Sequence, residues 1–231
     1  MLNLSFVLFQ ADTIIEEPNI ATSQNIVDII IAGGWMGIAN VLILLLLSFI
    51  ALYIFIERWL TIKRAGKIDE NFINNIRASV ASGNIDGAKA LCRATDTPSA
   101  RMIEKGLMRI GKPLKDIDAA IENVGNLEIF KLEKNLSTLA SIAGAAPMIG
   151  FLGTVTGMIL AFYTMASQDN VSPALLAGGI YQALITTAFG LVIGIFAFVG
   201  YNLLVANVDK VVFQMEKTTI DFMDLLQEPT R

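Results

Sequence analysis

Between residues 135 and 208 the chain carries one acidic or basic side chain, Asp169, and this scarcity of charge constrains the fold more than any other feature. Two apolar stretches lie there, from about Leu139 to Ala166 and from about Ala177 to Ala206, and a third runs from about Trp35 to Ile56. Crossing the hydrocarbon layer takes about 20 residues. A helix in a soluble core would show a charged face, and these show none. We therefore predict three transmembrane helices; two long buried hairpins are the alternative.

The rest of the chain has a more ordinary composition, so the sequence divides by hydropathy. Overall, 54% of residues are hydrophobic and 16% are charged, against about 25% charged in soluble domains. The predicted segments are an outer tether with an amphipathic helix (1–34), the first span (35–57), a cytoplasmic helical region (58–134), the second and third spans (135–206) and a cytoplasmic C-terminal helix (207–231). The fold class is all-α, in a lipid bilayer.

Lysines and arginines set the predicted orientation. None occurs in residues 1–57 or 135–209, whereas 14 of the 17 lie in 58–134 and three lie in 210–231. Basic residues collect on the cytoplasmic side of a membrane. The N-terminus is therefore expected outside the cytoplasm and the C-terminus within it. Residues 1–11 are apolar but lack the basic start of a signal peptide, so cleavage there stays open.

The region after the first span is punctuated like a set of short helices. One helix is expected over about 69–81 and the next over about 85–94. Thr97 then supplies an N-cap and Pro98 the first helical position, and we expect Gly111 to end that helix.

Two longer helices are predicted beyond this region. One should start after Pro113 and run into the second span, with a weak point at Gly125. The third span shows no breaker before Pro229, so it should continue well past the hydrocarbon layer into the cytoplasm.

The composition excludes most catalytic chemistry. Cys92 is the only cysteine and the chain has no histidine, which removes Ser-His and Cys-His dyads and zinc sites. Gly106 and Gly111-Lys112 have the spacing of a phosphate loop, but Pro113 stands where a hydroxyl is needed and no strand precedes them. We expect no enzyme activity, no cofactor, no metal and no nucleic-acid partner.

Small and hydroxylated side chains form one stripe on each of the last two spans. On the second span the stripe holds Ala143, Pro147, Gly150, Thr154, Gly157, Ala161 and Thr164; on the third it holds Ala183, Thr187, Gly190, Gly194 and Ala197, with Gln182 and Thr186 beside it. Such stripes let helices pack closely, here through Gly153/Gly157 and Gly190/Gly194. Two interpretations of the stripes stay open. The stripes serve helix packing only, or their hydroxyls also line an ion pathway. Polar groups inside membranes are candidates for function, which favours considering the second.

At these residues the chain resembles the MotA/TolQ/ExbB proton-channel family. The stretch Ala146–Met158 followed by Ala161-Phe162 is similar to the family's second-span signature. The stretch 183–191, followed by Tyr201-Asn202, is similar to its third-span signature. Glu57-Arg58 at the end of the first span matches as well.

The resemblance implies a pentamer of this chain around two transmembrane helices of an ExbD- or TolR-like partner, whose membrane aspartate carries the proton. Thr154 and Thr187 match the family's pore threonines, and Thr186 and Gln182 would lie on the same ion pathway. Hydroxyls alone cannot take up and release a proton near neutral pH. Gln182 stands where the family often has glutamate, and Phe196 replaces a family proline.

The implied setting is a bacterial inner membrane, where ion flow through an ExbB-type subunit energises a TonB-like protein for outer-membrane transport. A TolQ-type subunit of an envelope motor and a non-conducting membrane scaffold are the alternatives. The flagellar MotA branch has four spans, so the three predicted here favour ExbB or TolQ.

Overall fold

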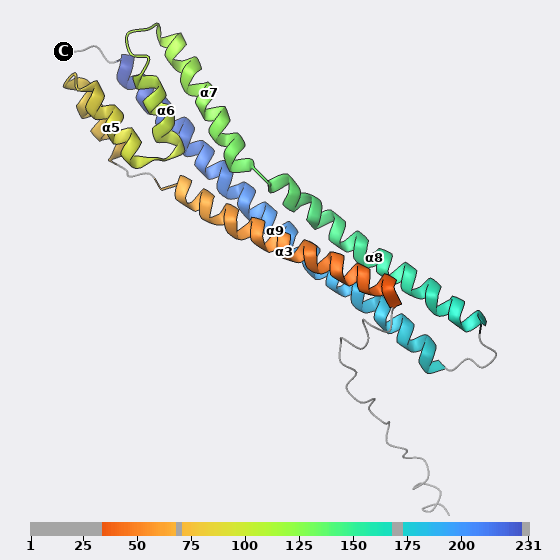
Figure 1. Ribbon diagram of the computed structural model, residues 1–231. Helices are drawn as coiled ribbons and strands as arrows, with labels where there is room; N and C mark the ends of the chain where they lie inside the picture. The colour runs from red at the N-terminus through yellow and green to blue at the C-terminus, as the bar shows by residue number, and fades with distance from the viewer. Residues whose placement is uncertain (1–33, 68–70, 168–172, 228–231) are drawn as a thin grey trace, which may run out of the picture.

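The computed structural model describes residues 34–67, 71–167 and 173–227. The expected tether and the outer amphipathic helix lie outside these ranges. Within the described residues all regular structure is helical, which confirms the all-α prediction. The molecule is elongated, with the apolar helices at one end and the short helices at the other (Figure 1).

Within these described ranges, three helices are long and apolar enough to cross a membrane. They are α3 (Gly34–Ala65), α8 (Leu136–Ser167) and α9 (Pro173–Gln227). Only 17%, 22% and 33% of their most apolar windows are buried within the chain. Phe49, Met148 and Phe151 are among the large side chains left exposed. Lipid or other subunits must therefore cover most of this surface.

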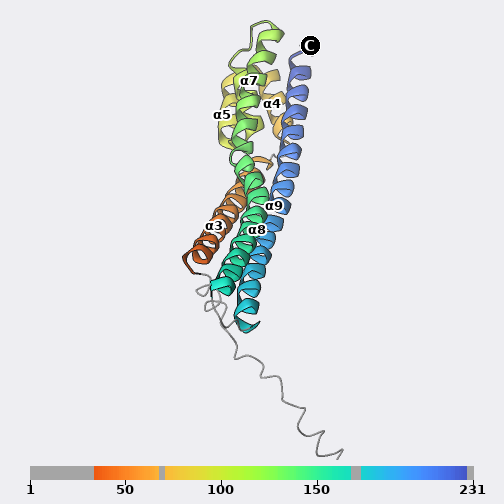
Figure 2. The ribbon, with the colours of Figure 1, turned by 90° about the vertical axis from the view of Figure 1, so that its right-hand side faces the viewer.

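Four shorter helices form a bundle beside the second half of α9 (Figure 2), and three of them pack directly against it. They are α4 (Phe72–Ala81), α5 (Ile85–Thr95), α6 (Pro98–Leu107) and α7 (Leu114–Glu133). Since α9 continues without a break from the spanning end into this bundle, one helix carries both halves of the structure. Its continuity to Gln227 is as predicted.

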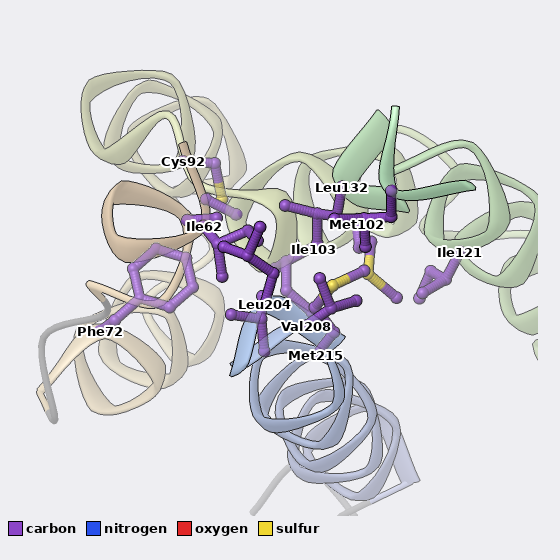
Figure 3. Close-up of a cluster of buried hydrophobic side chains, with 14 of the residues drawn as sticks. Ile62, Phe72, Cys92, Met102, Ile103, Ile121, Leu132, Leu204, Val208 and Met215 are labelled. Atoms are coloured by element: carbon purple, nitrogen blue, oxygen red, sulfur yellow. The ribbon is translucent and has the colours of Figure 1, made fainter. Parts of the chain in front are cut away.

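The core of this bundle is continuous with the packing of α3 against α9. Figure 3 shows Ile62 of α3 beside Leu204 of α9, with Val208 and Met215 further along the same face of α9. Ile103 of α6 is fully buried in the same cluster. Hydrophobic burial thus joins the end with the three long apolar helices to the end with the short helices without a gap.

The predicted cap at α6 is confirmed, but the predicted end of that helix is wrong. Thr97 accepts a hydrogen bond on Oγ1 from the backbone N–H of Ala100, at 3.4 Å, and Pro98 is the first helical residue. The helix ends at Leu107, whereas we expected it to reach Gly111. A tight turn follows, in which the N–H of Arg109 bonds the carbonyl of Gly106. Gly111, with a φ of +94°, closes that turn.

The expected single helix from Pro113 into the second span is also interrupted. Lys134 has a ψ of 133°, and Asn135 lies in the left-handed region with a φ of 64°. Asparagine adopts this conformation more readily than other non-glycine residues. Gly125, the expected weak point, is buried within α7, where a Cβ would lie 2.9 Å from the Met102 methyl group. The chain therefore changes direction at residues 134–135, between α7 and α8.

Candidate functional site

The backbones of α8 and α9 meet most closely where glycines face each other. A Cβ built on Gly190 would lie 2.6 Å from the Ala146 carbonyl oxygen and 2.9 Å from the Gly150 Cα. Both distances are shorter than real Cβ contacts, and both neighbours are backbone atoms, which cannot rotate away. Any larger residue at Gly190 would force the helices apart at this point.

The remaining small residues of the two stripes also lie at this interface, although not as glycine pairs. A Cβ on Gly194 would lie 2.5 Å from Pro147 Cγ, and one on Gly157 would lie 3.1 Å from the Cβ of Ala183. The two stripes thus face each other within one subunit. Their close approach brings hydroxyl groups of the two helices into contact.

Thr154 of α8 and Thr187 of α9 share a hydrogen bond between their hydroxyls. Thr154 Oγ1 also lies 3.1 Å from the Ala183 carbonyl and 3.4 Å from that of Gly150. Thr187 Oγ1 lies 3.1 Å from the Gly150 carbonyl of the opposite helix. Two hydroxyls and two carbonyls therefore form a polar cluster, half-buried between two apolar helices.

Thr186 lies on the side of this cluster that faces α3. It is 4% exposed and donates a hydrogen bond to the Ala183 carbonyl, at 2.8 Å. A Cβ on Gly153 would lie 2.6 Å from its Oγ1, so Gly153 leaves room for this side chain. Gln182 is half-buried one turn earlier on α9.

Asn40 of α3 is a polar residue that the sequence analysis missed. It is 9% exposed, and its Nδ2 lies 3.5 Å from the Cβ position of Gly153, so all three spanning helices meet here. The sequence signal was available, since Asn40 is a lone amide in an otherwise apolar run from Ile38 to Leu47. A buried amide in a span is a candidate for function on the same ground as the threonines.

The cluster is electrically neutral. The described parts of α8 and of α9 up to Val208 contain no acidic or basic side chain, and no group of metal-ligating residues occurs among the described residues. Hydroxyls, amides and carbonyls can replace part of an ion's hydration shell or order water. They cannot carry a proton by titration near neutral pH.

A second polar network lies where α3 leaves the apolar region. Arg58 is 5% exposed, pairs with Glu57 and donates a hydrogen bond from Nη1 to the Lys131 carbonyl of α7, at 3.0 Å. Glu128, 3% exposed, accepts hydrogen bonds from Arg101 at 2.6 Å and from Lys131 at 2.7 Å. This network joins α3, α6 and α7 near the break before α8.

The charged state of Glu128 is favoured by its partners. Burial acts to raise the pKa of this carboxyl, but the hydrogen bonds and positive charges of Arg101 and Lys131 outweigh burial and lower it below its ordinary value of 4.5. Glu128 therefore stays ionised in the bundle at neutral pH. Only the Glu57-Arg58 part of this network was singled out from the sequence.

The model of the MotA/TolQ/ExbB proton channel family matches residues 94–217, more than half of the 231-residue chain, and includes both threonines of the cluster. The chain belongs to this family. The match covers α6, α7, α8 and most of α9, whereas Asn40 and Arg58 lie before it. The family is a channel family and not a class of enzymes.

Three relatives illustrate how far the similarity to this channel family extends. The Tol-Pal system protein TolQ of Haemophilus influenzae is 36% identical over 116 residues, which is 50% of this chain and 46% of that protein. The biopolymer transport protein ExbB of Neisseria meningitidis serogroup B is 26% identical over 187 residues, 75% and 84% of the two chains. A Synechocystis protein named ExbB-like 3 is 30% identical over 183 residues, 77% and 81%. The chain thus spans about half the length of TolQ.

Proposed function

We propose that this chain is the ion-channel and scaffold subunit of an ExbB–ExbD-type motor in a bacterial inner membrane, conducting protons to energise TonB-dependent outer-membrane transport. The observation that carries the proposal is the Thr154–Thr187 hydroxyl pair, which is half-buried between α8 and the part of α9 up to Val208, whose described residues carry no acidic or basic side chain. Packing alone needs the small residues of this interface but not two facing hydroxyls.

The neutral cluster requires a partner for proton transfer. Because no titratable carboxylate or amine lies along the described seam, the group that binds and releases the proton must come from another chain. A one-span ExbD- or TolR-like protein with a membrane aspartate supplies that chemistry. Homo-oligomerisation, as a pentamer, would cover part of the large apolar surface that one chain leaves exposed and would enclose the partner's helix.

The extent of similarity favours the ExbB branch. The match to ExbB of Neisseria covers 84% of that protein, whereas the match to TolQ of Haemophilus covers 46%. The higher identity to TolQ, 36% against 26%, supports a Tol-Pal-type envelope motor as the second candidate. In either system the N-terminus would be periplasmic and the C-terminus cytoplasmic, as the distribution of basic residues predicts.

The test compares Thr→Val with Thr→Ser at the two clustered threonines. Valine keeps the shape of Thr154 or Thr187 but removes the hydroxyl, and serine keeps the hydroxyl but removes a methyl group. Interhelical hydrogen bonds in membranes contribute about 0.6 kcal/mol, and a methyl-sized void costs on the order of 1 kcal/mol. Stability therefore predicts mild and similar effects. An ion pathway predicts that valine abolishes function while serine retains much of it.

Thr156→Val is the matched control, because the Thr156 hydroxyl bonds only to carbonyls of its own helix, Leu152 at 2.9 Å and Gly153 at 3.2 Å. The measurement is energy-dependent uptake across the outer membrane, together with co-purification of the partner to confirm assembly. Valine variants at Thr154 and Thr187 that assemble and support normal uptake would reduce these threonines to packing residues.

A further inference from the structure

A hollow of about 310 Å³ lies between the end of α3 and the middle of α9. Figure 1 shows these two helices side by side. Ile62 and Leu204, which meet in the buried cluster (Figure 3), form part of its apolar wall. Its polar lining comes from Lys63, Asn207, Lys210 and Gln214. The size suits a small polar headgroup.

The polar lining is arranged for an anion. Within the described residues, neither Lys63 nor Lys210 forms an ion pair, so both ammonium groups keep their charge available. Asn207 and Gln214 add side-chain amide groups, which can donate N–H hydrogen bonds. The nearest acidic residue on α9, Asp209, does not line this hollow; it lines a neighbouring one, which shares Lys210 and Gln214 with the first.

The position of the hollow indicates where the anion comes from. Trp59 lines it at the end of the first apolar stretch, and tryptophan collects at the membrane–water boundary. Leu60 and Leu203 adjoin the lining residues Trp59 and Leu204 in the sequence, and each is 48% exposed, so apolar surface continues beyond the hollow on α3 and α9. A soluble anion would gain nothing from this apolar approach, whereas the acyl chains of a lipid would follow it.

We propose that this hollow binds the phosphate group of an anionic phospholipid, with Lys63 and Lys210 as the charged contacts and Trp59 beside the glycerol region. The lipid would bridge α3 and α9 at the side of the membrane where the short helices begin. This site is separate from the threonine cluster, so the lipid proposal can be tested independently of ion conduction.

The chain itself provides a reporter for this site. It has two tryptophans, Trp35 and Trp59, so a Trp35→Phe variant leaves Trp59 as the only indole. The full-length variant is placed in phosphatidylcholine bilayer discs with increasing fractions of brominated phosphatidylglycerol, and quenching of Trp59 is measured. We expect quenching to rise more steeply with brominated phosphatidylglycerol than with brominated phosphatidylcholine. A basic residue near an anionic membrane surface changes lipid preference about fivefold.

Substitution of both lysines distinguishes lipid binding in the hollow from a general attraction of the basic chain to anionic lipid. In Lys63→Gln/Lys210→Gln the preference for phosphatidylglycerol should fall about 25-fold, since each lysine contributes about fivefold. The control Lys105→Gln/Lys112→Gln makes the same change of charge at two exposed lysines away from the hollow and should keep the preference. If the glutamine pair lowers helicity, Gln214→Glu serves as a second variant, because an added carboxylate should repel the phosphate without removing a lysine.

The alternatives give distinct results. Equal quenching by the two brominated lipids in the native chain would overturn the proposal, as would a preference that survives in both the glutamine pair and Gln214→Glu. Inorganic phosphate, added in excess over the lipid, should leave quenching unchanged. If inorganic phosphate relieves the quenching, the hollow binds soluble phosphate and the lipid assignment is wrong.

Discussion

Replacing Gly190 by alanine tests whether backbone contact between α8 and α9 builds the polar cluster. The added Cβ would lie 2.6 Å from the Ala146 carbonyl oxygen and 2.9 Å from Gly150 Cα. The second distance is roughly 0.6 Å short of the 3.5–4.0 Å optimum between carbon atoms. Overpacking of this kind costs about 1–3 kcal/mol, and here it acts on backbone, which cannot be relieved by a rotamer change.

Gly144→Ala is the matched control on α8, because a Cβ there meets nothing within 4 Å. Alanine is favoured over glycine in a helix by about 1 kcal/mol, and both variants receive that gain. The difference between them therefore isolates the contact, and we expect Gly190→Ala to be less stable than Gly144→Ala by about 1–3 kcal/mol.

The assay is unfolding of the purified chain in mixed micelles with increasing sodium dodecyl sulfate, followed by far-ultraviolet circular dichroism. Because the helices must part beside Thr187, Gly190→Ala should also lower the rate at which a Thr154→Cys/Thr187→Cys pair forms a disulfide. A Gly190→Ala chain that is as stable as Gly144→Ala, and that cross-links equally fast, would refute the packing argument.

Three further predictions follow from other parts of the chain. The predicted topology is tested in a Cys92→Ser variant, in which a cysteine at Ser23 should react with an impermeant thiol reagent in whole cells and a cysteine at Ser82 should not. In the native chain the Cys92 thiol should be unreactive, since burial and Glu104 raise its pKa to about 12. Native mass spectrometry of the purified chain should give a pentamer, and liposomes holding this chain alone should not leak protons; a stable monomer counts against the motor. Glu128→Gln should lower the free energy of unfolding by about 1–3 kcal/mol at pH 7. Because the pKa of Glu128 is lower in the folded chain than its ordinary value of 4.5, the difference between native and variant should be full above pH 4.5 and should shrink as the pH falls through the lowered pKa of the folded chain. Thermal melts at several pH values measure this difference.

Most helices could be predicted from the sequence, because the features that determine them, such as hydropathy and capping residues, lie close together along the chain. The three apolar spans follow from uninterrupted hydropathy, and the start of α6 follows from Thr97 and Pro98. The stripe of small residues on each of the last two spans follows from helical spacing. That the two stripes face each other within one subunit was not deducible, since it depends on how α8 and α9 pair.

The features that escaped prediction depend on contacts between distant residues or on conformations that the sequence merely permits. Asn135 is compatible with a left-handed conformation but does not require it, so the break before α8 could not be placed. The burial of Asn40 depends on Gly153 and Thr186, more than 100 positions away. Glu128 is likewise held by Arg101, 27 positions before it. The spacing of residue types along a single helix gives no information about such contacts between different helices.

The connections of α8 and of α9 to the short helices differ in stiffness. On one side α7 joins α8 through the non-helical residues Lys134 and Asn135, where two dihedral angles suffice to change the direction of the chain. On the other side α9 runs unbroken for 55 residues, about 80 Å at 1.5 Å per residue. A torque applied to the short helices would therefore be transmitted along α9 to its membrane-spanning part. The joint at residues 134–135 would allow the tilt of α8 to differ from that of α7.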